Sequence, residues 1–324
     1  KELLHFFTQN LKKFGKKHHA LFVKMDPAIQ YRSFKVDEEQ IINADAAMKI
    51  PSIKKTGAKW NGLTMEMDAT IQPRFQANVH VKDFSEEQLS KKTRQMLRTA
   101  RNKGVKTRIT RMDGVLELTR LMSLTESRKN VRLRSNDEGI YYKKLLELYG
   151  EDAFILLAEL NIKELLSQSE ARLKQIEKDF SHLKENQEKK RRALVEQRFS
   201  VNRDVEELTE KLKTDGEVVN IAATLSIRFG ETSEILYAGM DERYKRYMAP
   251  YLAWFDTIQA LFEIGATSAN MGGLEGSLKD GLLQFKKNFN PMIEEFIGEF
   301  DLPVNPILFN ASQFAYKLKK SKKI

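Results

Sequence analysis

The chain has 324 residues, 41% of them hydrophobic and 31% charged, and it contains no cysteine. This composition predicts a globular protein of about two domains and excludes disulfide frameworks, thiol nucleophiles and thiolate metal sites. Its 55 lysine and arginine residues outnumber 45 acidic ones, so the net charge of +10 favours polyanionic partners such as RNA, anionic lipid headgroups or phosphorylated substrates.

The N-terminal third predicts an alternation of helices and strands. Apolar residues recur with helical spacing from Leu3 to Phe14, and a short apolar strand over 20–25 ends where Asp26-Pro27 forces a turn. A helix near 38–48 and a strand over 76–81 follow. Because the chain enters its first helix at once, we expect a fragment whose first strands are missing. No apolar run approaches the ~20 residues that span a bilayer, so we expect the protein to act inside the cell.

A helix over 85–103 is predicted next, with Ser85 as its N-cap and Gly104 at its end. From 91 to 108 the chain carries eight basic residues and no acidic one, the steepest local charge bias in the sequence. The bias fits either a solvated helix face or a surface that contacts tRNA phosphates or anionic lipid. The residues selected for that contact are Lys91, Lys92, Arg94, Arg98 and Arg101.

The alternation continues with a strand over 105–110, helices over 114–128 and 141–149, and an apolar strand over 153–160. A heptad stripe then begins at Leu166 and resumes at Leu194 after a polar segment. Because polar residues interrupt the seam, an antiparallel coiled-coil hairpin is favoured over a single rod. This arm, 165–214, carries 12 basic and 10 acidic residues, which is typical of a mechanical or docking element.

The last third predicts a hairpin of strands over 218–229 and 234–238, a helix over 244–264 and a strand over 269–271. The remaining predicted elements are a helix over 281–289, a strand over 292–300 and a last helix over 306–316. This order is that of an acyltransferase core of the GNAT type. The segment from Tyr237 to Glu242 stands where a Gly-rich turn would bind coenzyme A. It has one glycine and two carboxylates, so CoA is a poor candidate donor.

Signatures of other chemistries are missing from the sequence. The five histidines form no H-x-x-x-H or H-E-x-x-H pair, which disfavours a metal site. The sequence has no G-x-x-x-x-G-K-[ST] or strand-bound G-x-G-x-x-G phosphate loop, and no G-x-S-x-G elbow. We therefore expect chemistry without a metal or a covalent intermediate.

Several motifs carry a resemblance that spans essentially the whole chain in order. They are Lys24-Met-Asp-Pro27, Ile71-Gln-Pro-Arg-Phe75, Ser90-Lys-Lys-Thr-Arg94, Arg98-Thr-Ala-Arg-Asn-Lys-Gly104, Leu236-Tyr-Ala-Gly239 and Phe285-Lys-Lys-Asn-Phe289. Together with the coiled-coil insertion, these motifs resemble the Fem family of tRNA-dependent aminoacyltransferases, and most closely its MurM branch. Against the family's pattern, the first part of the first domain is absent.

The resemblance implies an α/β (α+β) fold of two GNAT-like domains, the first N-terminally truncated, with the coiled-coil hairpin inserted in the second. We expect the remainder of the first domain at 1–82, the second domain at 83–164 and 215–324, and the arm at 165–214. The implied reaction moves alanine or serine from aminoacyl-tRNA to the side-chain amine of the stem-peptide lysine in lipid II, or in its UDP-linked precursor, during peptidoglycan synthesis. An ester on tRNA is already activated, so no cofactor is required.

The resemblance also implies two catalytic residues. Lys286 matches the family position thought to face the transferred carbonyl, where an ammonium stabilises developing negative charge. Asp26 matches a carboxylate proposed to orient or deprotonate the amine. By pattern alone, the favoured interpretation of Lys286 is a solvated helix lysine. That of Asp26 is a turn-forming residue before proline.

Four further residues match substrate-binding positions. Arg134 and Tyr141 match residues that hold the phosphate-sugar part of the precursor, and Tyr142 is the alternative to Tyr141. Tyr237 lines the same pocket in relatives, and Phe285 is either a substrate wall or ordinary core.

Other classes of protein remain open. A non-enzymatic basic coiled-coil protein that binds RNA or membranes explains the charge and the heptads, and a CoA-dependent acyltransferase explains the strand order. For the aminoacyltransferase we expect a cytoplasmic protein, peripheral at the inner face of the plasma membrane, in contact with anionic lipid. The amino acid transferred, its place in the branch and the oligomeric state are not determined by the sequence.

Overall fold

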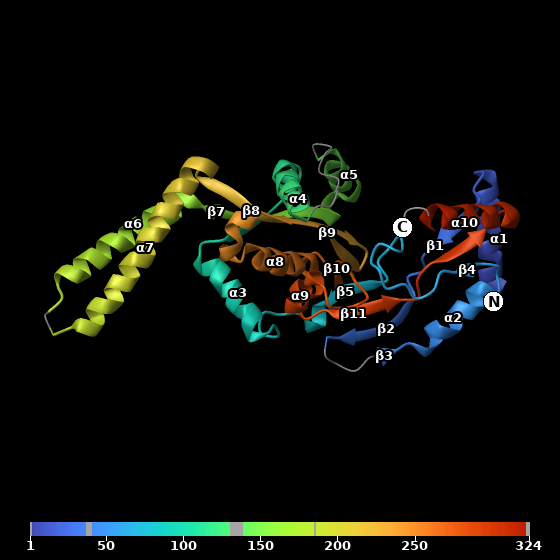
Figure 1. The fold of residues 1–324 in the computed structure, drawn as a ribbon, viewed down its shortest axis with the longest axis horizontal. Helices are drawn as coiled ribbons and strands as arrows, with labels where there is room; N and C mark the ends of the chain where they lie inside the picture. The colour runs from blue at the N-terminus through green and yellow to red at the C-terminus, as the bar shows by residue number, and fades with distance from the viewer. Residues whose placement is uncertain (1, 37–40, 130–138, 185, 322–324) are drawn as a thin grey trace. The chain divides into compact units, whose positions relative to one another are not determined.

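The computed structural model describes residues 2–36, 41–129, 139–184 and 186–321. The chain divides into two compact units: unit 1 comprises Lys1–Leu89 and Thr267–Ile324, and unit 2 comprises Ser90–Ala266 (Figure 1). The predicted division placed all of 215–324 in the second domain. Residues 267–324 instead join the N-terminal segment, because their strands pair with strands formed before residue 90.

Unit 1 contains two groups of antiparallel strands. One is a three-stranded sheet in the order β1 (Phe22–Met25), β12 (Phe300–Pro303), β4 (Lys59–Trp60). In the other, five strands lie side by side in the order β3 (Ile41–Ile42), β2 (Gln30–Lys35), β11 (Met292–Phe296), β5 (Phe75–His80), β10 (Ser268–Leu274). Strand β11 is therefore central, with β2 on one side and β5 on the other.

The helices of unit 1 are α1 (Glu2–Lys17), α2 (Ala44–Lys54), α9 (Gly281–Lys286) and α10 (Pro306–Ser321). Short 3-10 helices cover Val81–Asp83 and Lys287–Phe289. Buried residues of α2 pack with Phe300 and Leu302 of β12, and Leu4 and Leu11 of α1 pack against this cluster. Of the apolar residues that predicted α1, these two pack against the cluster, whereas Leu3, Phe7 and Phe14 are exposed.

Three predictions in unit 1 were wrong. The strand predicted over 292–300 is two strands, because Gly298 has a φ of +80° and separates β11 from β12. Strand β2 was not predicted, since its sequence is mostly polar and its pairing with β11 holds it in place. The helix predicted near 38–48 begins at Ala44, where the side chain of Asn43 accepts a hydrogen bond from the Ala46 amide; 37–40 lie outside the described residues.

Unit 2 is built on four antiparallel strands in the order β9 (Thr232–Met240), β8 (Val218–Phe229), β7 (Ala153–Asn161), β6 (Lys106–Thr110). Its helices are α3 (Lys91–Asn102), α4 (Val115–Lys129), α5 (Ile140–Tyr149), α6 (Ile162–Ser181), α7 (Glu188–Asp215) and α8 (Ala249–Glu263). Short 3-10 helices cover Met112–Gly114, Gly150–Asp152 and Glu242–Tyr247.

Helices cover both faces of the unit 2 sheet. Ile155 and Leu157 of β7 and Leu225 of β8 share a buried cluster with α4 and α5. Thr224, the neighbour of Leu225, points the other way and its hydroxyl lies 2.6 Å from that of Thr257 on α8. Since alternate residues of a strand face opposite sides, α4 with α5 and α8 form the outer layers (Figure 1). This is why the first six residues of β7, 153–158, are all apolar.

The arm is the predicted hairpin, formed by α6 and α7 between the paired ends of β7 and β8 (Figure 1). Ile176, Leu194 and Val201 form its buried seam, as the heptad stripe predicted. At its base, Asp215 accepts hydrogen bonds from Tyr244 (2.5 Å) and Arg243 (3.0 Å). These contacts anchor α7 to the 3-10 helix after β9.

Two boundaries in unit 2 differ from prediction. The helix predicted over 244–264 is a 3-10 helix followed by α8, because Met248 between them has a φ of +55°. The basic helix α3 begins at Lys91, and its N-cap is Ser90, whose hydroxyl accepts a hydrogen bond from the Thr93 amide at 3.1 Å. Ser85 was the predicted cap, but residues 86–88 form a turn and do not continue into the helix. Gly104 does terminate α3, with a φ of +78°.

Candidate active site

Lys286 is the last residue of α9 and its side chain is buried. The helix starts at Asp280, whose carboxylate accepts a hydrogen bond from the Leu283 amide at 3.1 Å. Lys286 is only 5% exposed, and its Nζ donates to the carbonyl oxygen of Gly273 at 2.8 Å. The alternative interpretation as a solvated helix lysine is therefore wrong; that description fits Lys287, which is exposed.

The carbonyl that holds Lys286 comes from a bulge in β10. The register of β10 against β5 shifts between Asn270 and Gly273. Gly272 has a φ of +85°, a region that favours glycine, and its amide donates to the side-chain oxygen of Asn270 at 2.8 Å. A Cβ on Gly273 would lie 2.4 Å from Pro73, so both glycines are required by the local geometry.

Sequence analysis missed this bulge. The predicted strand over 269–271 ends before Gly272, and Asn270 was not selected as a site residue. The signal was available, because an isolated glycine in a strand often marks a bulge and an asparagine two residues earlier caps such a turn.

Phe285, beside Lys286, is half-buried. Its ring centroid lies 5.5 Å from that of the fully buried Phe289, in an edge-to-face arrangement. One side of the ring is therefore core, and the exposed part is available as a wall next to Lys286.

Asp26 follows β1 in a cluster of ionisable side chains. Its carboxylate accepts a hydrogen bond from the Gln72 amide at 3.3 Å. Burial and the nearby negative charge of Glu299 raise its pKa, and the Gln72 amide and Lys24 only partly offset them. A carboxylate with a raised pKa is better suited to accept a proton than an ordinary surface aspartate.

The motifs around Asp26 and Arg74 are held together by buried acidic residues of the C-terminal segment. Lys24 Nζ lies 2.8 Å from Glu299 and 3.1 Å from Asp301. Burial alone lowers the pKa of Lys24, but its hydrogen bonds to these two carboxylates outweigh burial and raise it. Glu299 also accepts a hydrogen bond from the Ile71 amide.

Arg74 is 3% exposed and donates to Glu295 at 2.6 Å and to the Phe296 carbonyl at 2.9 Å. Arg32 pairs with the same Glu295. A buried arginine with a carboxylate partner is strongly destabilised if either partner is removed. These contacts fix the segment before β5 against β11.

In unit 2, Tyr237 of β9 lies against two adjacent tyrosines of α5. The ring centroid of Tyr237 is 5.0 Å from that of Tyr142 and 6.1 Å from that of Tyr141. Tyr142 is fully buried, whereas Tyr141 is half-buried. Of the two alternatives, Tyr141 is therefore the residue able to meet a ligand. Arg134 lies outside the described residues.

The predicted contact residues of α3 are exposed: Lys91, Lys92, Arg94, Arg98 and Arg101. The buried face of the helix is Thr93, Leu97 and Ala100. Among the described residues, the first four of these basic side chains form no ion pair with a carboxylate, in contrast to Lys106 and Arg108, which pair with Glu164 and Glu159. The basic surface is thus not neutralised by its own unit.

The segment compared with a CoA-binding turn has a different structure. Gly239 lies within β9, where a Cβ would approach the Leu121 backbone to 2.7 Å, so it allows α4 to pack closely. Asp241 is buried and accepts a hydrogen bond from Arg243 at 2.7 Å. A pyrophosphate site needs unbonded backbone amides at the start of a long helix, and this segment does not have that arrangement.

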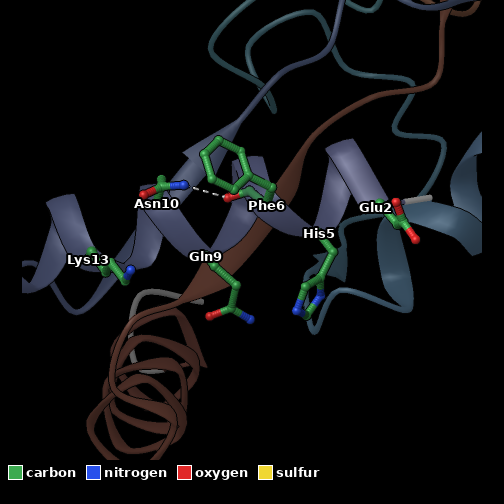
Figure 2. Close-up of a pocket in the computed structure, with 6 residues that line it drawn as sticks. All are labelled: Glu2, His5, Phe6, Gln9, Asn10 and Lys13. Atoms are coloured by element: carbon green, nitrogen blue, oxygen red, sulfur yellow. Dashed lines mark hydrogen bonds between the residues drawn. The ribbon is translucent and has the colours of Figure 1, made fainter.

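Two grooves lie away from these residues. One, of about 470 Å³, runs along α1, and the described residues that line it belong to that helix (Figure 2): Glu2, His5, Phe6, Gln9, Asn10 and Lys13. Asn10 there is bound to the Phe6 carbonyl at 2.9 Å. Neither this groove nor a second one between β6 and α8 contains a predicted site residue.

Within the described ranges, no three His, Asp or Glu side chains gather as metal ligands. No helix in this part of the chain is long and apolar enough to cross a membrane.

Comparison with known proteins gives consistent results. A model of the FemAB family matches residues 1–317. The chain is similar to the aminoacyltransferase FemB of Staphylococcus epidermidis, with 28% identity covering 98% of this chain and 80% of that protein. It is also similar to the aminoacyltransferase FemA of the same species, with 23% identity covering 99% and 80%. The crystal structure of FemX matches the fold with a TM-score of 0.71 at 22% identity, covering 96% of this chain and 79% of that one. The predicted α/β fold is confirmed.

Proposed function

The chain belongs to the FemAB family, and we propose that this chain transfers an aminoacyl group from tRNA to a peptidoglycan precursor. Its relatives FemB and FemA are aminoacyltransferases. The acceptor is the side-chain amine of the stem-peptide lysine in lipid II. The donor amino acid is alanine or serine, as the resemblance to the MurM branch implies.

The reaction is a direct aminolysis. The lysine nitrogen attacks the ester carbonyl, and a tetrahedral intermediate with a negative oxygen forms. The carbon–oxygen bond to the tRNA ribose then breaks, an amide remains, the amine loses a proton and the ribose hydroxyl gains one. The protein must position the amine, stabilise the oxyanion and accept the proton.

The burial of Lys286 is the observation that best supports this proposal. A lysine is seldom buried without a structural or chemical reason, and the Nζ of this one donates to a backbone carbonyl in the bulge of β10. A positive charge that is fixed in a site of low dielectric constant stabilises an oxyanion better than a solvated positive charge does. We assign Lys286 to the oxyanion and the exposed part of Phe285 to the adjacent wall.

Asp26 is the proposed proton acceptor. Its raised pKa brings the carboxyl closer to the pH at which it works, which favours general-base catalysis. Tyr141 and Tyr237 contribute to binding the phosphate-sugar part of the precursor, together with Arg134. The exposed α3 residues bind tRNA phosphates or anionic lipid at the inner face of the plasma membrane.

The proposal is tested with the purified chain, lipid II in its lysine form and, separately, radiolabelled alanyl-, seryl- and glycyl-tRNA. We expect label to move from one of the first two tRNAs to the lipid. A parallel reaction with the UDP-linked precursor compares the two acceptors.

The control is the Lys287→Met variant, which removes an exposed neighbouring lysine and is expected to transfer normally. No transfer from any tRNA, with salt-sensitive tRNA binding intact, would favour a non-enzymatic RNA-binding protein, for which the unneutralised basic surface of α3 is the supporting observation.

A further inference from the structure

Hydrogen bonds connect Gln76 and Asn270 to the backbone of the β10 bulge, and the next carbonyl of that bulge holds Lys286. Gln76 of β5 donates through Nε2 to the Pro73 carbonyl at 3.1 Å, and its Oε1 accepts from Nδ2 of Asn270 at 2.9 Å. The oxygen of Asn270 accepts from the Gly272 amide at 2.8 Å. The next carbonyl, that of Gly273, accepts from Lys286 at 2.8 Å. All of these residues lie in unit 1.

Asn270 makes hydrogen bonds with both the oxygen and the nitrogen of its side-chain amide. Its oxygen closes a turn onto the amide two residues later, which holds Gly272 in the conformation with positive φ. Its nitrogen donates to Gln76, which fixes the orientation of the Asn270 amide and therefore which atom faces Gly272. Neither bond is required to pair β10 with β5, because ladder pairing resumes at Gly273 opposite Gln76.

The direction of the Gly273 carbonyl depends on this turn. A bulge re-aims the groups that follow it, and here the group re-aimed is the acceptor that holds the Lys286 ammonium. If the turn opens, the carbonyl rotates and Nζ loses its acceptor at 2.8 Å. A displacement of about 1 Å in a catalytic group can reduce a rate by about 100-fold.

We propose that Asn270, oriented by Gln76, is the positioning residue for Lys286, since it sets the bulge whose carbonyl fixes the lysine amine. The inference rests on the proposed function for its catalytic consequence, but the state of the amine is measurable without any turnover.

The first test measures the reactivity of Lys286 in the full chain by limited acetylation with acetic anhydride, quantified by mass spectrometry. Lys286 and the exposed Lys287 lie on the same peptide, so Lys287 is an internal reference. In Asn270→Ala, acetylation of Lys286 relative to Lys287 should rise about fivefold or more. Asn270→Asp retains the acceptor for the Gly272 amide but cannot donate to Gln76, so its rise should be smaller.

The matched control is Asn305→Ala. Asn305 also uses its side-chain oxygen to accept from backbone amides in unit 1, those of Ile307 at 3.1 Å and Leu308 at 3.2 Å. This variant loses a comparable local cap and should leave the reactivity ratio of Lys286 to Lys287 unchanged. A purely structural role of Asn270 predicts equal effects of the two variants, and that result would overturn the proposal.

The second test measures transfer kinetics. In Asn270→Ala, kcat should fall about 10- to 100-fold while the KM values for tRNA and precursor change less than about threefold. An unchanged kcat in a variant with a reactive Lys286 would also overturn the proposal. If the wild-type chain transfers no label but Asn270→Ala still exposes Lys286, the proposed function fails and the positioning of the amine by Asn270 stands.

Discussion

Lys286 and Lys287 are adjacent in the chain, but only the first is held away from water. Burial of an ammonium opposes folding, and hydrogen bonds to neutral acceptors compensate only in part. Replacing Lys286 by methionine, an apolar side chain of similar length, should therefore leave the melting temperature unchanged or slightly higher.

The same Lys286→Met variant should lose about 100- to 1,000-fold in kcat, the range seen when a single oxyanion donor is removed. The loss is measured by following the transfer of labelled alanyl or seryl groups to lipid II. Turnover equal to that of the Lys287→Met control, with folding intact, would remove Lys286 from the mechanism.

Asp26 permits a test of stability against pH. Because folding raises its pKa above the usual 3.8, the folded state favours the protonated carboxyl. The associated stabilisation is fully present below about pH 3.8 and is lost as the pH rises through the raised pKa. In Asp26→Asn, which is neutral at every pH, the free energy of unfolding relative to wild type should therefore increase between pH 4 and pH 7.

Urea denaturation at several pH values measures this difference, with Asp68→Asn, at an exposed position, as the parallel control. The Asp26→Asn variant should also lose about 100-fold or more in turnover. A variant that is stabilised at neutral pH and fully active would exclude Asp26 as the base.

At the scale of single elements, the start of α3 distinguishes the two candidate caps. Ser90→Ala removes the hydroxyl that accepts from the Thr93 amide and should reduce the free energy of unfolding by about 1 kcal/mol. Ser85→Ala should change it by less than half as much. Equal effects of the two substitutions in urea denaturation would contradict the assigned helix start.

The packing of α4 on β9 depends on Gly239. A Cβ there would lie 2.7 Å from the Leu121 carbonyl carbon and 2.8 Å from its oxygen, so Gly239→Ala must displace the helix backbone. We expect a loss of about 1 to 3 kcal/mol. Gly281→Ala is the control, since a Cβ at Gly281 meets nothing within 4 Å. A neutral Gly239→Ala variant would show that α4 can shift freely.

At the scale of the whole molecule, the net charge of +10 is distributed unevenly. The arm is nearly neutral and several basic side chains of unit 2 are paired, whereas Lys91, Lys92, Arg94 and Arg98 of α3 form no ion pair within the described part of the chain. If α3 contacts phosphates, each removed contact flattens the dependence of log K on log salt by about 0.7 to 0.9.

The triple variant Lys92→Gln, Arg94→Gln, Arg98→Gln should therefore reduce the salt slope of tRNA binding by about two. The control is a second triple variant, Lys13→Gln, Lys16→Gln, Lys17→Gln, which makes the same change in net charge on α1. Equal slopes for the two triple variants, measured by filter binding at several salt concentrations, would assign the affinity to overall charge and not to α3.

The sequence by itself determined the features that depend on neighbouring residues. The heptad stripe predicted the hairpin of α6 and α7, because periodicity reports directly which face is buried. An apolar run predicted β7 and a β-rich run predicted β8. The motifs around Lys286, Asp26 and Tyr237 carried the resemblance to the family, which the family model confirms, and the site residues stay a prediction.

The tertiary structure decided what depends on residues far apart in the chain. Strand β2 is polar and exists through its pairing with β11, more than 250 residues later. The burial of Lys286 depends on a carbonyl of β10, and the choice between Tyr141 and Tyr142 depends on packing against β9. Periodicity does not identify such partners, because the burial and hydrogen bonding of a residue depend on which distant segments the fold places next to it.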